Sequence, residues 1–504
     1  MELFHLPGKL NVQANKASQA IRFLLNNNVV EADDIAPATS ILSFLRQELR
    51  LMGTKEGCAE GDCGACTVVI GELKHDRLVV KPVNACIQFV PTLDGKALFT
   101  VEHLRSAAGN LHPVQQAMVE CHGSQCGFCT PGFVMSLWGL YLSHVDGGKS
   151  VSPDDSAVRQ AITGNLCRCT GYRPIVDAGK RMCDLPKVPF DREALANSLR
   201  SLRRTTSLHY QHEGCHFHSP TSLAELAALK ADTPAATILA GGTDVGLWVN
   251  KQFRDLGDII YTGEVAELNT IAEDVNGLTI GAAVSLNDAY ATLKNRYPEM
   301  NEMWERFASM PIRNAGTLGG NIANGSPIGD AMPALIVLGS SVTVASAAKS
   351  RQLPLEDLYV AYQQKAMQAD EVVASVHIPH RSPELRFRNY KLSKRFDSDI
   401  SAVCAAFAVE LDGDNISTCR IAFGGMAATP RRALQTEKRL IGQKWSEPTV
   451  RDGMEALLFD YTPLTDMRAS AGYRLKTAQN LLYRFFLETR AVDAMAAGEL
   501  SVFA

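Results

Sequence analysis

Three cysteines packed into nine residues constrain this 504-residue chain more than any other sequence feature. In the run CAEGDCGAC, four residues separate Cys58 from Cys63, two separate Cys63 from Cys66, and Cys86 follows after nineteen more. The chain holds 13 cysteines, and its start lacks the basic, apolar and small-residue plan of a secretory signal. Because cytosolic thiols are kept reduced, we expect a cytoplasmic protein whose cysteines bind metal rather than form disulfides.

The spacing of this first set is typical of a plant-type 2Fe-2S cluster held by four thiolates. A loop around a flat two-iron core must offer thiolates to both metals from a short arc, and the fourth can come from a distant segment. Gly57, Gly61 and Gly64 leave room for backbone N–H groups to approach the sulfurs and stabilise their charge. The alternative is a structural zinc site, which more often uses paired, closely spaced cysteines.

A second set of four cysteines follows the first. Two residues separate Cys126 from Cys129, and one separates Cys167 from Cys169. Such a two-plus-two arrangement holds zinc as well as iron, so the spacing leaves both open. Each pair adjoins a predicted helix end, which places two helix pairs around one metal core. The other five cysteines are expected to behave as small hydrophobic residues: Cys121, Cys183, Cys215, Cys404 and Cys419.

Two glycine-rich turns mark the second half of the chain. In ILAGGTDV, residues 238–245, an apolar strand runs into the Gly241–Gly242 turn, whose successive N–H groups can form an anion-binding nest. The turn lacks the lysine of a Walker loop and does not fit GxGxxG. Residues 315–334 contain a second such turn at Gly319–Gly320. Each alone is typical of an ordinary tight turn, but together they suggest a dinucleotide held by backbone amides.

Composition places the chain among soluble globular proteins. Charged residues make up 21% and hydrophobic residues 46%, and the formal net charge is -4. These values fit neither a disordered chain nor a nucleic-acid-binding surface. No apolar run is long enough for a membrane-spanning helix. At roughly 150 residues per domain, the length predicts about three or four domains.

The pattern of apolar residues changes along the chain. Residues 20–78 predict a small mixed sheet with one helix at TSILSFLRQEL, capped by Thr39 or Ser40. Four helical stretches follow, one of them capped by Ser152 just before a proline. Residues 184–215 are proline-rich and weakly periodic, which predicts a linker. Beyond it, apolar strands alternate with helices, as in an α+β or α/β domain.

Five motifs, in the same order along the chain, resemble those of the xanthine dehydrogenase family of molybdenum hydroxylases. They are TKEGCAEGDCGACTV, GSQCGFCTPG, NLCRCTGYRPI, AGGTDVG and AGTLGGNIANGSPIGD. The resemblance covers nearly the whole chain and is strongest to the bacterial small subunit, in which iron–sulfur and flavin domains are fused and the molybdopterin part is a separate polypeptide. The chain departs from the family in an N-terminal extension, in residues 26–28 (NNN) in place of a tighter turn, and in Cys121.

The resemblance implies a multidomain α+β fold. The implied domains are a plant-type ferredoxin-like domain of the β-grasp fold (1–94), a four-helix 2Fe-2S domain (95–185), a linker (186–213), an FAD-binding domain (214–385) and a C-terminal α+β flavoprotein domain (386–504). These parts use up the chain, so we expect the molybdenum site to lie in a partner subunit.

The resemblance also implies the cofactor-binding residues, and no catalytic residue in this chain. One cluster would be held by Cys58, Cys63, Cys66 and Cys86, and the other by Cys126, Cys129, Cys167 and Cys169, which favours iron–sulfur over zinc. FAD would contact one loop made of Ile238, Leu239, Ala240, Gly241, Gly242, Thr243, Asp244 and Val245. It would also contact Thr317, Leu318, Gly319, Gly320 and Asn321, and further Phe307, Asp330, Val373 and Lys391.

The implied function is electron transfer. A molybdopterin-binding catalytic partner would hydroxylate a purine, and its electrons would pass singly through the helical-domain cluster and the plant-type cluster to FAD, and then to NAD. The implied assembly is a heterotetramer with two copies of each subunit. Three alternatives stay open: a related hydroxylase for another N-heterocycle or an aldehyde, a stand-alone iron–sulfur flavoprotein electron carrier, and a zinc scaffold.

Overall fold

The computed structural model describes residues 19–106, 108–145 and 152–500, so the N-terminal extension noted in the sequence lies outside the described residues. The chain divides into two compact units. The first comprises Met1–Ala266 with Ser285–Asn287 and Ser309–Gly316, and the second comprises the rest, so residues of the predicted FAD-binding domain belong to both. Within the described ranges, no helix has the length and apolarity needed to span a membrane.

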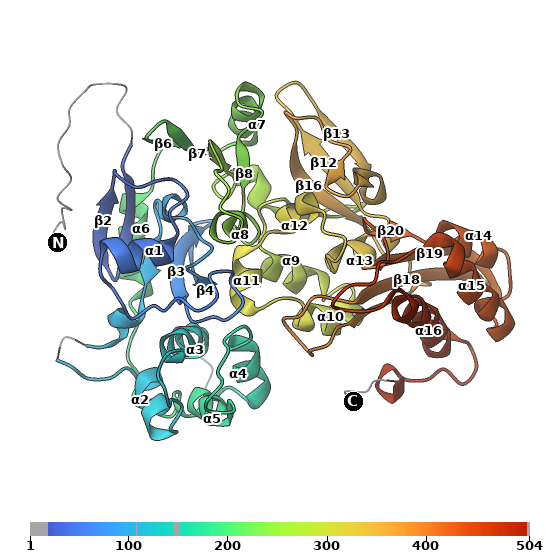
Figure 1. Cartoon of the computed structure of the whole chain (residues 1–504), viewed down its shortest axis with the longest axis horizontal. Helices are drawn as coiled ribbons and strands as arrows, with labels where there is room; N and C mark the ends of the chain where they lie inside the picture. The colour runs from blue at the N-terminus through green and yellow to red at the C-terminus, as the bar shows by residue number, and fades with distance from the viewer. Residues whose placement is uncertain (1–18, 107, 146–151, 501–504) are drawn as a thin grey trace. The chain divides into compact units, whose positions relative to one another are not determined.

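The first unit begins with a five-stranded mixed sheet in the order β2-β1-β5-β3-β4, of which Figure 1 labels β2, β3 and β4. All its pairs are antiparallel except β1 with β5. Asn26 and Asn27, with φ of 50° and 72°, form the two-residue turn of the first hairpin, because asparagine tolerates the left-handed conformation that this turn requires. The strands are β1 (Ile21–Leu25), β2 (Asn28–Ala32), β3 (Thr67–Lys74), β4 (Arg77–Asn84) and β5 (Ala97–Phe99).

The predicted helix beside this sheet is present. It begins as α1 (Ile41–Ser43) and continues as one π-helical turn, η1 (Phe44–Glu48). Ser40 is the N-cap, since its hydroxyl accepts a hydrogen bond from the Ser43 N–H at 3.0 Å. A short 3-10 turn, η2 (Val90–Leu93), lies between β4 and β5, and another, η3 (Val101–Leu104), follows β5.

Four helices form the next part of the first unit, as the sequence predicts. The start of α4 differs from the prediction, because Asp154 and not Ser152 is its N-cap. The Asp154 carboxylate accepts from the Ala157 N–H at 2.8 Å, whereas the Ser152 hydroxyl donates to Asp184. The helices are α2 (Pro113–Glu120), α3 (Thr130–Val145), α4 (Asp155–Ala161) and α5 (Arg173–Arg181).

The segment predicted as a linker, residues 186–213, holds a helix and a strand. Helix α6 (Arg192–Leu202) is capped by Asp191 and buries Leu195, Leu199 and Leu202 in the core shared with the preceding helices. These leucines recur at helical spacing, so one face of the helix is apolar. A four-stranded sheet, β6-β7-β9-β8, completes the unit. The strands of this sheet and the helices in the same part of the first unit are β6 (Leu208–His212), β7 (Cys215–Ser219), α7 (Leu223–Asp232), β8 (Thr237–Leu239), α8 (Val245–Asn250), β9 (Ile259–Tyr261) and α11 (Met310–Ala315).

The second unit contains an antiparallel sheet in the order β10-β11-β16-β12-β13. The strands are β10 (Ile271–Glu273), β11 (Gly277–Gly281), β12 (Ser341–Ala345), β13 (Ser350–Pro354) and β16 (Val372–Pro379), beside the small hairpin β14 (Tyr359–Ala361) and β15 (Gln364–Lys365). The helical segments in this stretch of chain are η4 (Ala266–Asn269), α9 (Leu286–Leu293), η5 (Pro298–Met300), α10 (Asn301–Arg306), α12 (Leu318–Asn324), α13 (Ala331–Val337) and η6 (Leu355–Leu358).

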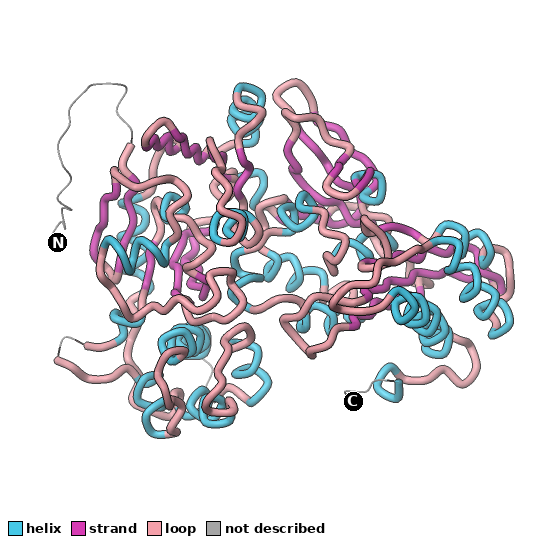
Figure 2. The backbone as a smooth tube through the Cα atoms, in the orientation of Figure 1, coloured by secondary structure: helices cyan, strands magenta, loops and turns pink. Residues whose placement is uncertain are grey.

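A second sheet in this unit, β17-β18-β19-β20, has helices on both faces (Figure 2). On one face Phe407 and Phe423 pack with Phe485 of α16. On the other face α13 contacts β18 and β19, where Cys404 and Gly424 are small enough for close approach. The elements are β17 (Arg386–Leu392), β18 (Val403–Asp412), β19 (Asn415–Gly424), β20 (Arg431–Arg432), α14 (Leu434–Leu440), α15 (Glu447–Asp460), α16 (Ala471–Thr489) and η7 (Ala497–Leu500). The multidomain α+β prediction is confirmed.

Candidate iron–sulfur and flavin sites

The first four cysteines meet as two pairs of sulfurs. Cys58 and Cys63 share a hydrogen bond, which lowers the pKa of Cys58 to about 5 and raises that of Cys63. Cys66 and Cys86 share another, which lowers the pKa of Cys66 and raises that of Cys86. A 2Fe-2S cluster held by four cysteines takes two thiolates at each iron, so this arrangement suits it.

The loop around these sulfurs offers backbone N–H groups to them. The N–H groups of Glu60 and Cys63 lie 3.4 and 3.3 Å from the Cys58 sulfur. The backbone reaches this geometry through the left-handed region at Gly61 and Gly64, with φ of 79° and 68°. Hydrogen bonds of this kind stabilise the negative charge of a ligated thiolate. Gly61 and Gly64 thus have the predicted conformation, whereas Gly57 has no positive φ and instead leaves space for the Cys63 sulfur, which would lie 2.7 Å from a Cβ there.

The second four cysteines also form two pairs. Cys126 and Cys169 are exposed and share a hydrogen bond, and Cys129 is hydrogen-bonded to Cys167. Burial raises the pKa of Cys129 to about 12. The Thr170 hydroxyl and N–H lie 3.2 and 3.5 Å from the Cys167 sulfur. Across the described ranges, no three histidine, cysteine or acidic side chains converge as ligands of a single ion. The paired sulfurs suit a second two-iron cluster.

The two cysteine loops contact each other directly. The Leu166 N–H donates to the Cys63 carbonyl at 3.0 Å, and the Asn165 amide donates to the Gly64 carbonyl at 3.0 Å. Asn165 is almost fully buried, and its own oxygen accepts from the Ser136 hydroxyl at 2.7 Å. A side chain on Gly132 would collide with the Gly64 carbonyl. Sequence reasoning gave Asn165 no role, although it is the first residue of the quoted motif NLCRCTGYRPI.

The first glycine-rich turn lies in the first unit, between β8 and α8. Among the residues that the structure describes, none accepts a hydrogen bond from the N–H groups of Gly241, Gly242, Thr243 and Asp244. Gly242 has a φ of 71°, and a Cβ there would lie 2.6 Å from the Ile87 carbonyl oxygen. Four free N–H groups ahead of a helix N-terminus fit a pyrophosphate.

The second glycine-rich turn lies in the second unit, at the start of α12. The Thr317 hydroxyl caps this helix by accepting from the Gly320 N–H at 2.9 Å. A side chain on Gly319 would collide with Ala282, so this glycine permits close backbone packing. The Asn321 side-chain oxygen is buried and accepts no hydrogen bond from any described residue. Such an orphaned acceptor fits a hydrogen-bond donor on a bound cofactor.

Two of the other predicted FAD contacts meet in the second unit. The Lys391 ammonium lies 2.6 Å from the Asp330 carboxylate, and both side chains are buried. The same nitrogen donates to the Asp399 carbonyl and to the Ser401 hydroxyl, both at 2.8 Å, so its three hydrogens are engaged within the protein. The remaining two predicted contacts sit elsewhere in the unit: Phe307 caps α10, and Val373 lies in β16.

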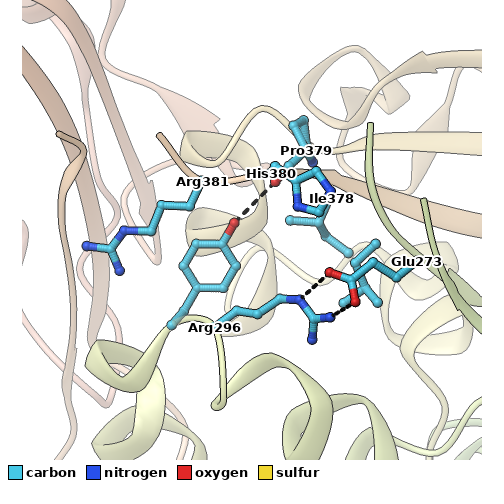
Figure 3. Close-up of a pocket in the computed structure, with 8 residues that line it drawn as sticks. Glu273, Arg296, Ile378, Pro379, His380 and Arg381 are labelled. Atoms are coloured by element: carbon cyan, nitrogen blue, oxygen red, sulfur yellow. Dashed lines mark hydrogen bonds and ion pairs between the residues drawn. The ribbon is translucent and has the colours of Figure 1, made fainter. Parts of the chain in front are cut away.

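A separate pocket of about 250 Å³ in the second unit contains none of the predicted residues (Figure 3). Arg296 meets the Glu273 carboxylate there, with Nε 3.2 Å from the nearer oxygen. Tyr297 donates to the Pro379 carbonyl at 3.2 Å, and Arg381 is ion-paired with Glu299. Both guanidinium groups are therefore neutralised, and we assign this pocket no ligand.

Four family profiles match the chain in succession. Residues 24–90 match a 2Fe-2S iron–sulfur cluster binding domain, and residues 100–180 match a 2Fe-2S binding domain. Residues 210–381 match the FAD binding domain in molybdopterin dehydrogenase, and residues 388–489 match the CO dehydrogenase flavoprotein C-terminal domain.

Similar whole proteins are redox enzymes. Over 94% of this chain, identity is 31% to xanthine dehydrogenase of Emericella nidulans, 32% to xanthine dehydrogenase of Drosophila subobscura and 31% to aldehyde oxidase 1 of Oryctolagus cuniculus. The chain spans only 39 to 40% of the length of these relatives.

Two solved structures are similar to about half of the chain. Carbon monoxide dehydrogenase from Hydrogenophaga pseudoflava shares 25% identity with a TM-score of 0.51, over 53% of this chain and 94% of that one. Quinoline 2-oxidoreductase from Pseudomonas putida shares 26% identity with a TM-score of 0.50, over 55% of this chain and 98% of that one.

The domains and their order define an iron–sulfur flavoprotein that is an oxidoreductase. The chain belongs to the xanthine dehydrogenase family of molybdenum hydroxylases, of which it comprises the iron–sulfur and FAD electron-transfer portion. The prediction of this family from five motifs is confirmed.

Proposed function

We propose that this chain is the electron-transfer subunit of a cytoplasmic xanthine dehydrogenase. It takes electrons from a molybdopterin-binding partner, passes them through two 2Fe-2S clusters to FAD, and reduces NAD. One observation carries this proposal: in the first unit, four segments form an unbroken series of contacts. The loop of Cys167 touches the loop of Cys63 and Cys66, and the Ala85 N–H, next to Cys86, donates to the Cys66 carbonyl at 3.2 Å. Gln88, two residues after Cys86, then donates to the Gly241 carbonyl at 2.6 Å.

The residues of this chain bind and position the redox groups in this proposal. When bound, each cluster exchanges one electron at a time and FAD exchanges two. We assign the first cluster to Cys58, Cys63, Cys66 and Cys86, and the second to Cys126, Cys129, Cys167 and Cys169. In the first unit we assign FAD contacts to residues 238–245, where the N–H groups of Gly241, Gly242, Thr243 and Asp244 hold the pyrophosphate. In the second unit we assign FAD contacts to residues 317–321, Phe307, Asp330, Val373 and Lys391. The Lys391 ammonium, fully bonded within the protein, acts there by positioning Asp330.

The substrate and assembly in this proposal come from similarity. The relatives named xanthine dehydrogenase support hydroxylation of a purine by the proposed partner subunit. We propose a heterotetramer with two copies of each subunit. Aldehyde oxidase 1 is as similar as the xanthine dehydrogenases, so an aldehyde or another N-heterocycle is the second candidate substrate.

Single cysteine variants test the cluster assignment. Cys86→Ser removes one ligand of the first cluster and Cys169→Ser one ligand of the second, whereas Cys215→Ser lies outside both sets and is the control. Each ligand variant is expected to lose about half of the iron and acid-labile sulfide, together with one of two electron paramagnetic resonance signals. The control is expected to keep both. Full iron content in both ligand variants would contradict the assignment, and zinc without iron in the parent protein would contradict the function.

Activity assays test the division of labour between subunits. The purified chain is expected to reduce a dye with NADH but not to oxidise xanthine, because the molybdenum site belongs to the partner. Purine oxidation by the chain alone would contradict the proposal. Co-purification of a molybdopterin-binding polypeptide, followed by assays of that complex with xanthine, an aldehyde and quinoline, distinguishes the candidate substrates.

A further inference from the structure

One side chain joins the two segments that carry the first set of cysteines. Asn250 is the last residue of α8, and its amide nitrogen donates to the Cys86 carbonyl at 2.7 Å and to the Ala59 carbonyl at 3.0 Å. Cys86 is one of the proposed ligands, and Ala59 directly follows another. Both hydrogens of the amide group are therefore used, one on the segment of Cys58 and one on the segment of Cys86.

The same helix begins at the flavin loop, which packs on the residue after Cys86. A Cβ on Gly242 would lie 2.6 Å from the Ile87 carbonyl oxygen, and one on Gly246 would lie 2.8 Å from the Ile87 Cα. The Ile87 side chain is fully buried and its tip faces Gly61 of the cysteine loop. The backbone of the flavin loop therefore lies against the Ile87 backbone, and the Ile87 side chain extends from there to the loop of Gly61.

These contacts have consequences for charge and for position. Asn250 directs the positive end of its amide dipole at a loop that must carry extra negative charge whenever the first cluster is reduced. Hydrogen bonds and dipoles around a cluster are among the determinants of its reduction potential. Without Asn250, the Ala59 and Cys86 carbonyls would lose this donor, and the two cysteine segments would lose their link to α8.

We propose that Asn250 is a positioning residue for electron transfer between the plant-type cluster and FAD. Its amide group raises the reduction potential of that cluster and holds Cys86 against the flavin loop. The inference rests on the proposed function. In each transfer one electron leaves the cluster, which is oxidised, and enters FAD; two transfers with two protons from solvent complete the reduction of FAD. The partner's substrate supplies the electrons.

Redox titration of the holoprotein, followed by electron paramagnetic resonance, tests this. Asn250→Leu keeps a similar volume without donors, and Asn250→Asp keeps the shape but adds negative charge. Both are expected to lower the potential of the plant-type cluster, the aspartate more, while the helical-domain cluster in the same molecule is unchanged. Rapid-mixing reduction of FAD through the clusters is expected to slow on the order of tenfold, since small misplacements of reacting groups cost that much or more. Asn250→Gln, which keeps the donors, is expected to restore part of the rate.

Two further variants separate this role from general damage. Gln88→Leu removes only the bond to the flavin loop, so it is expected to slow FAD reduction without moving either cluster potential. Asn110→Leu, at an exposed asparagine of the helical domain, is expected to change nothing. If Asn250→Leu contains both clusters and FAD but keeps the parent's plant-type cluster potential and rate of FAD reduction, the inference is wrong while the proposed function stands. Equal shifts in the potentials of both clusters would have the same meaning. A parent protein lacking iron or flavin would instead overturn the proposed function.

Discussion

The Lys391 ammonium and the Asp330 carboxylate lie 2.6 Å apart with neither side chain reaching solvent. Ser401 completes the cluster, because its hydroxyl donates to the second Asp330 oxygen at 2.6 Å and accepts from Lys391. Buried charges are tolerated when each one is paired and hydrogen-bonded. The pair therefore forms a buried polar connection between β17 and the start of α13.

Removing one member of this pair is expected to be costly. Lys391→Met leaves the Asp330 carboxylate buried without its partner, and we expect the second unit to lose roughly 3 to 5 kcal/mol of unfolding free energy. Arg439→Met is the matched control, because the Arg439–Asp452 pair has the same 2.6 Å separation but is exposed, so its loss should change the unfolding free energy much less. The urea dependence of hydrogen exchange in β17 measures both. If Lys391→Met and Arg439→Met lower the free energy of unfolding equally, burial does not make the Lys391–Asp330 pair more important for stability than an exposed pair.

Substitution of Gly242 tests the flavin loop. Gly242→Ala places a Cβ 2.6 Å from the Ile87 carbonyl oxygen at a φ of 71°, so the loop must move. We expect FAD to bind at least about tenfold more weakly, since this strain costs on the order of 1 to 3 kcal/mol. Gly214→Ala, in the turn between β6 and β7, shares the positive φ, at 85°, with nothing within 4 Å of its Cβ, so it is the control for a strained glycine site outside the flavin loop and is expected to keep the FAD affinity of the parent protein. Flavin fluorescence during titration of the deflavinated protein gives both affinities, and equal affinities would contradict a role for the Gly242–Ile87 contact.

The sequence predicts the parts of the site that are formed by neighbouring residues, but it does not predict the contacts between distant segments. The spacing of Cys58, Cys63 and Cys66 predicts a cluster because thiolates that bind one core must leave a short arc of chain, which is a property of the sequence itself. Asn250 and Asn165 act on partners 191 and 101 residues away, and no local pattern records that. The helix inside the predicted linker is a different case, because its Asp191 cap and its leucines at helical spacing are local signals that the linker prediction overlooked.

Asn165 provides a test of the contact between the two cysteine loops. Asn165→Leu leaves the Gly64 carbonyl and the Ser136 hydroxyl buried without this partner, which is expected to cost roughly 2 to 4 kcal/mol in the first unit. Ser136→Ala removes only one of these bonds and is expected to have a smaller effect. The magnetic coupling between the two reduced clusters should weaken in the first variant and persist in the second. Unaltered coupling in Asn165→Leu would show that other contacts hold the loops together.

His112 makes the start of α2 sensitive to pH. Its Nδ1 accepts a hydrogen bond from the Val114 N–H at 3.2 Å, and Gln115 completes the capping box. Burial, together with the nearby His103, lowers the pKa of His112 from 6.5 to about 4. The ring is therefore neutral in the folded protein at pH values where the unfolded chain takes up a proton. A protonated Nδ1 could no longer act as the acceptor of the cap.

The sign of the effect follows from this depressed pKa. Above pH 6.5 His112 is neutral in both the folded and the unfolded state, so it does not lower the free energy of unfolding. Between pH 6.5 and about 4 only the unfolded state binds the proton, so the free energy of unfolding falls as the pH falls. The decline contributed by His112 is at most about 1.4 kcal/mol per pH unit. His112→Asn keeps a capping acceptor that does not titrate, so it should flatten this decline. Hydrogen exchange of Pro113–Glu120 between pH 7 and 4, corrected for the intrinsic pH dependence of exchange, measures the difference between the two proteins. Identical pH dependence in both would place the titrating group elsewhere, and His103, whose pKa burial also lowers, would be the next residue to replace.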